Sequence, residues 1–225
     1  MQDFAEVTGV ILKSAPAGEN DKRCEILTAE RGRLSFFARG ARRQGSRFLA
    51  ATEPFSFGVF RLYEGKNAYS LADAEIREYF AELRQDFSGA YYGMYFCDVA
   101  LFYARENNDD KELLKLLYAA LRALTKGEIP FRLIRAVYEL KAIAVNGEFA
   151  GVRSGDGLAG TLSDTAVYTV NHIVETPPAR LFHFLLNDEV FAEVRTVAAR
   201  ACKYAFEGRR FKSLELLDML AEPDS

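Results

Sequence analysis

The chain has 225 residues and a formal net charge of −3, with 49% hydrophobic and 27% charged residues. This composition is typical of a globular protein with a substantial core, and it excludes a wholly disordered chain. No run of about 18 apolar residues occurs, and the first residues lack the pattern of a signal peptide, so we expect neither a membrane span nor a leader.

The sequence contains few residues in patterns that would indicate a metal site or a catalytic site. Cys24, Cys97 and Cys202 are scattered without a CxxC pair, which predicts reduced cytosolic thiols and no cysteine zinc site. His172 and His183 have no zinc-like spacing. Neither a phosphate-binding GxxxxGK[ST] loop nor a Ser/His/Asp signature is present. We therefore expect no catalytic residues, no metal and no cofactor, and hence a protein that is not an enzyme.

Residues 1–80 are typical of short strands. Apolar, β-branched runs alternate with turn residues and predict strands at 6–15, 22–30, 33–40, 54–65 and 67–80. Glu30-Arg31-Gly32 and Gly65-Lys66-Asn67 are suited to hairpin turns. Five such strands predict a small barrel, with an ordinary sandwich or an SH3-like barrel as the alternatives.

From residue 80 onward the hydrophobic period becomes helical. Helices are predicted at 87–105, 109–126 and 130–146, and a glycine-rich loop at 147–164. The pattern then predicts an element at 165–174, helical segments at 178–187 and 188–206, and a last helix at 214–221. The predicted division is therefore a barrel domain (1–80) followed by an all-α domain (81–225), which is an α+β fold class.

The positive charge is concentrated in and around the third predicted strand. This stretch, 31–47, contains no Asp or Glu, and its cations are Arg31, Arg33, Arg39, Arg42, Arg43 and Arg47. Lys22 and Arg23 open the neighbouring strand and extend the patch. Six cations without counter-ions repel one another, so we expect a polyanionic partner, although a merely solvated face is the alternative.

Strand alternation separates core from surface within this stretch. Leu34, Phe36 and Ala38 fall on one face, and Arg33, Phe37 and Arg39 fall on the other. Arginine neutralises phosphates and an exposed ring stacks on bases, so the second face suits a nucleic acid. Phe37 packed beneath a neighbouring element is the alternative.

Two further surfaces are candidates. Arg209, Arg210 and Lys212 form a second cationic cluster, which either extends a DNA path or completes a helix end. The 130–146 helix carries Arg132, Arg135 and Lys141 beside apolar residues such as Leu140, so it suits an acidic, apolar peptide. An ordinary amphipathic helix with a solvated edge is the alternative for the second surface.

The order of these parts resembles a known family. The chain carries ARGARR at 38–43, a PFSFGVFRLYEG segment at 54–65, YELK at 138–141 and FKSLELL at 211–217. Together these are similar to the bacterial DNA repair protein family RecO, and the likeness covers nearly the full chain. The resemblance implies an N-terminal OB-fold and an α-helical C-terminal domain.

The resemblance also implies a function. Family members bind single- and double-stranded DNA, anneal complementary strands, and work with RecR to load RecA onto DNA coated by single-stranded-DNA-binding protein (SSB). The SSB C-terminal tail docks on the helical domain. We therefore expect a recombination mediator in the cytoplasm, associated with the nucleoid, with Lys22, Phe37 and the six arginines of 31–47 on DNA.

One departure from the family pattern is clear. Many members carry a four-cysteine zinc module after the YELK helix, whereas this chain has GVRSGDG at 151–157 without cysteine. We expect the glycine-rich loop at 147–164 to replace that module without metal. Two alternative functions follow from the residues alone: a protein-interaction adaptor whose basic loop binds acidic segments, and an RNA-binding OB protein.

Overall fold

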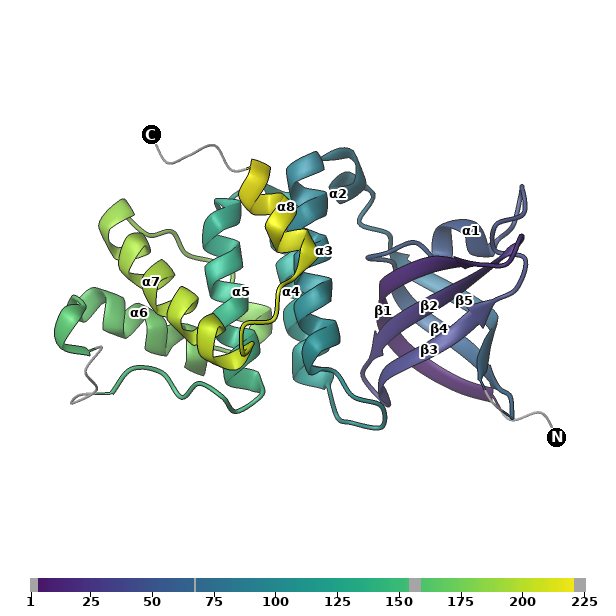
Figure 1. Cartoon of the computed structure of the whole chain (residues 1–225), viewed down its shortest axis with the longest axis horizontal. Helices are drawn as coiled ribbons and strands as arrows, with labels where there is room; N and C mark the ends of the chain where they lie inside the picture. The colour runs from purple at the N-terminus through teal and green to yellow at the C-terminus, as the bar shows by residue number, and fades with distance from the viewer. Residues whose placement is uncertain (1–3, 67, 154–158, 221–225) are drawn as a thin grey trace. The chain divides into compact units, whose positions relative to one another are not determined.

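The computed structural model describes residues 4–66, 68–153 and 159–220. Its strands close into a barrel in the first part of the chain (Figure 1). They are β1 (Phe4–Ala17), β2 (Asp21–Thr28), β3 (Gly32–Ala38), β4 (Phe57–Glu64) and β5 (Tyr69–Glu78), and they pair in the order β1-β2-β3-β5-β4 and back to β1. Neighbours are antiparallel except β3 and β5, which run parallel. This closure confirms the predicted five-stranded OB-fold barrel and excludes an open sandwich.

Two glycines allow the barrel to close. Gly9 of β1 and Gly58 of β4 are cross-strand partners. A Cβ on Gly9 would lie 2.3 Å from the carbonyl oxygen of Leu27, and a Cβ on Gly58 would lie 2.1 Å from that of Glu75. Any side chain at either position would push a neighbouring strand away, so this close approach of backbones requires glycine.

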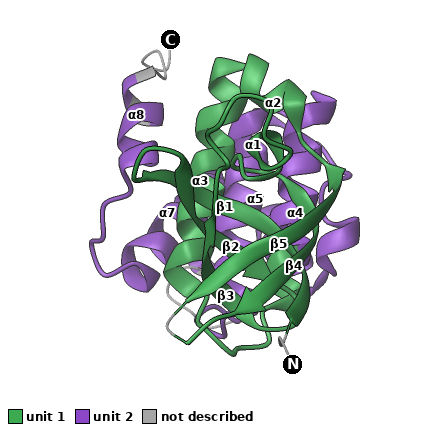
Figure 2. Ribbon diagram, turned by 90° about the vertical axis from the view of Figure 1, so that its right-hand side faces the viewer, with its two compact units in different colours: residues 1–114 green, residues 115–225 purple. Residues whose placement is uncertain are grey.

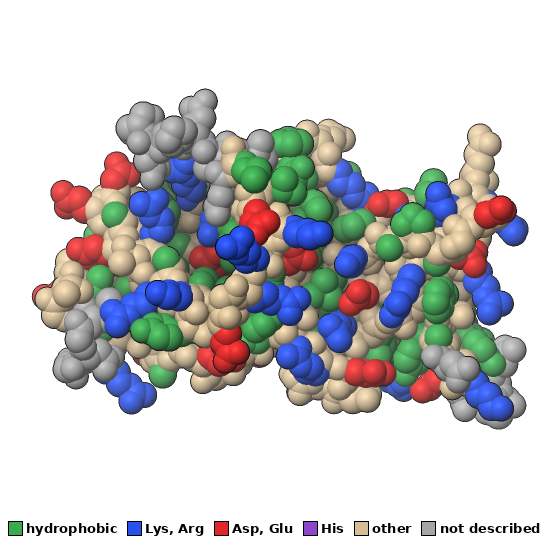
Figure 3. All heavy atoms as spheres, viewed as in Figure 1, with side chains coloured by type: hydrophobic (Ala, Val, Ile, Leu, Met, Phe, Trp, Pro, Cys, Tyr) green, Lys and Arg blue, Asp and Glu red, His purple; other side chains and the backbone are tan. Residues whose placement is uncertain are grey.

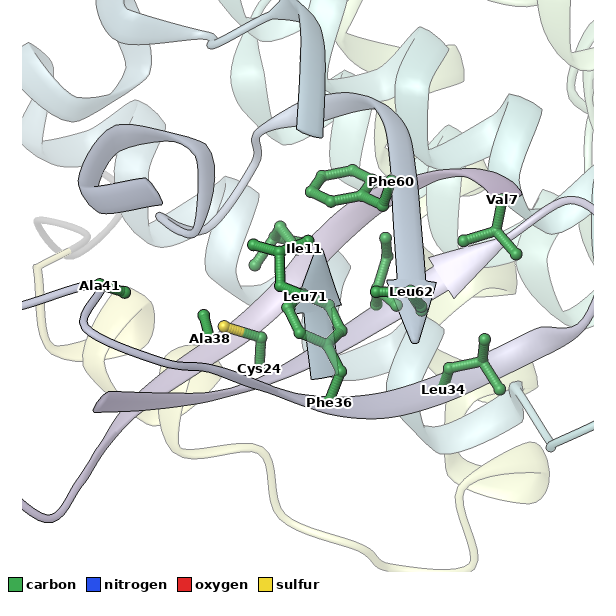
Figure 4. Packing of buried hydrophobic residues seen from close by; sticks show 11 residues of the cluster. Val7, Ile11, Cys24, Leu34, Phe36, Ala38, Ala41, Phe60, Leu62 and Leu71 are labelled. Carbon is green, nitrogen blue, oxygen red and sulfur yellow. The ribbon is translucent and has the colours of Figure 1, made fainter. Parts of the chain in front are cut away.

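The barrel encloses an apolar core. Figure 4 shows side chains from all five strands converging inside it, among them Phe36 and Phe60. The centroids of these two rings are 6.2 Å apart. The fully or nearly fully buried members are Val7, Ile11, Cys24, Ile26, Leu34, Phe36, Ala38, Ala41, Phe60, Leu62 and Leu71. Burial of such side chains stabilises the fold by about 1.5–3 kcal/mol for each large residue.

Three helices accompany the strands. Helix α1 (Phe48–Ala51) lies between β3 and β4 in sequence, and α2 (Ala81–Gln85) follows β5. Both are too short to show a helical hydrophobic period, which explains why the sequence pattern does not predict them. Helix α3 (Phe87–Tyr103) matches the helix predicted at 87–105, and its N-cap Asp86 accepts a hydrogen bond from the backbone N–H of Ser88 at 3.1 Å.

The chain divides into two compact units, residues 1–114 and 115–225, coloured separately in Figure 2. The division falls inside α4 (Lys111–Lys126), so the barrel and α1–α3 belong to one unit. The predicted domain boundary after residue 80 lies instead between β5 and α2. That boundary stays a prediction.

Hydrogen bonds explain why the first unit extends past the barrel. The backbone N–H of Arg33 donates to the carbonyl of Arg105 at 3.0 Å, and that of Asn107 donates to the carbonyl of Arg31 at 2.9 Å. Gly32 and Glu106 form a β-bridge between these bonds. Gly32 has φ +62°, and a Cβ there would lie 2.1 Å from the Arg105 oxygen. The segment after α3 is therefore attached to the start of β3.

A buried carboxyl group lies beside this junction. Asp110 is 5% exposed, and its Oδ1 accepts a hydrogen bond from the Asn108 amide at 2.8 Å. Its Oδ2 has no hydrogen-bond partner among the described residues. Burial raises the pKa of Asp110, and the Asn108 bond only partly offsets this effect.

The second unit is helical. The remainder of α4, α5 (Phe131–Val145), α6 (Asp164–Glu175), α7 (Asp188–Ala205) and α8 (Lys212–Leu220) form it, with 3₁₀ turns at Ala159–Thr161 and Pro178–Arg180. Helix α5 packs against α6 and α7. Ser163 caps α6 by accepting from the N–H of Ala166 at 3.2 Å, and Asn187 caps α7 through Val190 at 2.9 Å.

One helix prediction in this unit is wrong. The segment 178–187 forms only the Pro178–Arg180 turn and then continues without regular structure. Pro178 is the first residue of this short turn, and Asn187 at the end of the segment serves as the N-cap of α7. Part of the predicted glycine-rich loop, 154–158, lies outside the described residues. Over the residues described, no helix is long and apolar enough to cross a membrane.

Candidate nucleic-acid interface

The outer face of β3 carries an exposed aromatic ring. The predicted alternation is confirmed: Leu34, Phe36 and Ala38 are buried, and Phe37 between them is 37% exposed. The register places Arg23 of β2 directly opposite Phe37. The Arg23 Nε donates to the Ser35 hydroxyl at 3.1 Å, which holds the guanidinium group beside the ring.

A groove of about 560 Å³ runs over this face. Arg23, Ser35 and Phe37 contribute from β2 and β3, and the β4–β5 hairpin contributes the opposite side. The complete lining is Arg23, Ser35, Phe37, Glu64, Gly65, Lys66, Ala68, Tyr69 and Glu106. The strand 2–3 face beside the β4–β5 loop is where OB-folds bind oligonucleotides, so the groove has the place and size for an unstacked base.

A polar network fixes one wall of the groove. An Arg31 guanidinium N–H donates to the Tyr69 hydroxyl at 3.0 Å, and that hydroxyl donates to Oε1 of Glu64 at 3.1 Å. Arg31 also lies 3.6 Å from Oε2 of Glu64. The charge of Arg31 is therefore opposed by a carboxylate, and its main effect is to hold Tyr69 and Glu64 in position.

The turn after β3 carries the most available positive charge. Arg39, Arg42 and Arg43 are all exposed. Arg42 donates to the carbonyl oxygens of Gly18 and Glu19 at 3.0 and 3.1 Å, so its side chain also supports the β1–β2 turn. Among the described residues, no side chain opposes Arg39 or Arg43. Figure 3 shows Lys and Arg side chains across the barrel with acidic groups between them.

Two arginines of the basic stretch are partly engaged by the protein. Arg33 is half-buried and donates to the carbonyl of Leu101 at 3.5 Å. Arg47 lies 3.2 Å from Asp73 and 4.6 Å from the centroid of the Phe48 ring. Both remain predicted DNA contacts, but a phosphate would compete with these internal partners.

Lys22 is separate from the exposed cations. It is buried, and its Nζ lies 2.5 Å from Oε1 of Glu53. Its cross-strand partner is Ala38, which faces the core. The Lys22 charge is compensated inside the protein, so the structure does not bring it together with the Arg39–Arg43 turn.

The other predicted surfaces lie in the second unit. Arg209, Arg210 and Lys212 are exposed, and the Arg209 guanidinium is 5.8 Å from the centroid of the Phe211 ring. These cations are the second patch that the sequence predicts; Arg209 and Arg210 lie between α7 and α8 in the chain, and Lys212 is the first residue of α8.

Helix α5 offers less surface for a peptide tail than the sequence predicts. Leu140 and Lys141 are buried, and the Lys141 Nζ donates to the carbonyl of Val174 at 2.5 Å. Arg135 pairs with Glu139 at 2.8 Å. Arg132 is exposed. Burial removes Leu140 and Lys141 from any surface groove, because their side chains pack within the unit.

The groove contains residues that the sequence pattern did not single out. Lys66, Tyr69 and Glu106 line it, yet Glu106 reaches it only because the chain after α3 returns to β3. The predicted hairpin at 65–67 is the signal that would have indicated Lys66. Among the described residues, no group of three His, Cys, Asp or Glu side chains is placed to hold a metal ion.

Comparison with known proteins gives matches over most of the chain. Residues 1–80 match the family model for the recombination protein O N terminal, and residues 84–150 match the model for the recombination protein O C terminal. The DNA repair protein RecO of Acetivibrio thermocellus is 24% identical over 97% of this chain and 98% of its own length.

Shorter alignments reach higher identity. The DNA repair protein RecO of Clostridium novyi is 33% identical over 61% of this chain, and that of Anaeromyxobacter dehalogenans is 36% identical over 64%. These two alignments span 54% and 58% of the respective relatives.

Proposed function

This chain belongs to the recombination protein O family, and from that premise we propose that it acts in DNA repair as a DNA-binding recombination mediator that catalyses no covalent chemistry. In this proposal it binds single- and double-stranded DNA and anneals complementary strands. It works with RecR to load RecA onto SSB-coated DNA. The relatives named above are DNA repair proteins, which supports the role in repair.

The observation that carries the DNA-binding part is the position of Phe37. Its exposed ring faces a groove on the strand 2–3 surface, beside Arg23, and the turn with Arg39 and Arg43 follows two residues later. Two strand residues span about 7 Å. This distance suits a nucleotide whose base stacks on the ring while its phosphate lies at the turn.

Annealing follows from the same arrangement. Two complementary strands repel each other through their phosphates, and cations that neutralise them let the bases meet without ATP. Because stacking accepts the face of any base, the interface does not require one particular sequence. In this proposal Arg209, Arg210 and Lys212 are further candidate DNA contacts on the second unit, and Arg132 and Arg135 remain the candidate contacts for the SSB tail.

The test is annealing of two complementary labelled oligonucleotides, followed by fluorescence energy transfer without ATP. The parent protein should accelerate annealing. Phe37→Ala should weaken single-strand binding by about 5- to 150-fold, the loss of one stacked base, and slow annealing accordingly. Phe87→Ala is the matched control, because Phe87 is 62% exposed on α3 and does not line the groove. No acceleration by the parent would refute the proposed function.

A further inference from the structure

The groove beside Phe37 is balanced in charge, unlike the turn that follows β3. Two cations, Arg23 and Lys66, and two carboxylates, Glu64 and Glu106, line it. A phosphate placed there would be repelled by both carboxylates as much as it is attracted by the cations. The groove is therefore suited to a neutral base, and the turn with Arg39 and Arg43 is suited to the phosphate.

The two carboxylates are not equivalent. Glu64 already accepts the Tyr69 hydroxyl and faces Arg31. Glu106 is exposed, and among the described residues no side chain or backbone group donates to its carboxylate. Its backbone is nevertheless fixed, because it forms the β-bridge with Gly32. Glu106 is thus an unused hydrogen-bond acceptor at a fixed place on the rim of a base-sized groove.

A carboxylate accepts hydrogen bonds and cannot donate them at neutral pH. Cytosine, adenine and guanine present an exocyclic amine, whereas thymine has a single ring N–H, and the carbonyl oxygens on both sides of it repel a carboxylate. We propose that the groove binds one unstacked base against Phe37 and that Glu106 accepts a hydrogen bond from its exocyclic amine, so that amine-bearing bases are preferred to thymine. This inference rests on the proposed DNA binding and adds a base preference to it.

The cations of the groove do not supply this preference. The Arg23 and Lys66 side chains are hydrogen-bond donors, and donors bind carbonyl oxygens. Both pyrimidines present the O2 carbonyl, and thymine has a second carbonyl at O4, so these two donors do not favour cytosine. Discrimination between cytosine and thymine therefore depends on an acceptor, and Glu106 is the acceptor that remains available.

The experiment is fluorescence anisotropy with labelled oligo(dC) and oligo(dT) of equal length at pH 8, for the parent protein, Glu106→Gln and Glu75→Gln. The parent should bind oligo(dC) about fivefold more tightly or better, as expected for one base-edge contact. Glu106→Gln should bring the two affinities together, because the amide donates to thymine as well as accepting from cytosine. Glu75, exposed on β5 and absent from the groove, controls for the lost negative charge and should keep the preference.

The outcomes separate the two proposals. Equal binding of both oligonucleotides by the parent would overturn the base preference and leave the DNA-binding proposal intact. Preference that survives in Glu106→Gln would overturn the role of Glu106. Failure of the parent to bind either oligonucleotide at low salt would instead refute the proposed function itself.

Discussion

Arg39 and Arg43 provide the sharpest test of the phosphate path, because both are exposed and no described side chain opposes their charge. Arg42 is a poorer choice, since its guanidinium group also holds the carbonyls of Gly18 and Glu19. The change to make is therefore Arg39→Ala/Arg43→Ala. It removes two candidate phosphate contacts without breaking a side-chain hydrogen bond or ion pair among the described residues of the barrel.

The expected effect follows from counter-ion release. Each phosphate contact on a single strand contributes about 0.7 to the slope of log affinity against log salt. Loss of two contacts should flatten the slope by about 1.4. When salt falls from 1 M to 0.1 M, these two contacts alone raise the affinity about 25-fold. The variant should therefore bind weakly at low salt and approach the parent at high salt.

The measurement is anisotropy of a labelled single-stranded oligonucleotide at five or more salt concentrations. Arg200→Ala/Lys203→Ala is the matched control, because it removes the same net charge from exposed positions of α7. If both double variants flatten the slope equally, only net charge matters and the turn is no specific path. If the Arg39/Arg43 variant keeps the parent slope, these arginines do not touch phosphate.

Two further predictions concern stability. Gly32→Ala should lower the free energy of unfolding in urea by about 2–4 kcal/mol, because its φ is +62° and its Cβ would meet the Arg105 oxygen at 2.1 Å. Gly18→Ala is the control: its φ is +69° but the space around it is open, so it should cost only about 1 kcal/mol. Equal losses in the two variants would contradict the role of the contact. Asp110→Asn should stabilise the protein by about 1 kcal/mol at pH 7, since the amide carries no charge to desolvate and keeps an oxygen for Asn108. A raised carboxyl pKa means that folding favours the neutral acid, so the parent loses stability as pH rises above the ordinary pKa of 3.8. The stability advantage of Asp110→Asn should therefore vanish below that pH. A gain in stability that is independent of pH would refute this explanation.

Much of the barrel could be predicted because strand alternation and turn residues are local signals. Leu34, Phe36 and Ala38 face inward as the period of two requires. The same period also assigns Lys22 to the inner face, in phase with Cys24 and Ile26, and its burial was therefore readable from the sequence. What the sequence could not show is the carboxylate that compensates it, since Glu53 lies 31 residues away.

Contacts between distant segments account for the remaining differences. Lys141 looks like a solvated cation on an amphipathic helix, yet it is buried because its Nζ reaches the carbonyl of Val174. Glu106 has no local pattern that suggests binding, and only its bridge to Gly32 brings it to the groove. Helices α1 and α2 are defined by their surroundings more than by periodicity, because four or five residues are too few to show one.

The strand that carries Phe37 is held at both ends, and this affects how binding would proceed. At its start, Gly32 bridges to Glu106. At its end, the backbone N–H of Gly40 donates to Asp21 at 2.7 Å, and that of Arg42 donates to the carbonyl of Asn20 at 2.9 Å. Such a platform is preorganised, so little conformational entropy of the protein is lost when a ligand docks. The ordering cost of complex formation then falls on the flexible polynucleotide, which adapts to a surface already in place.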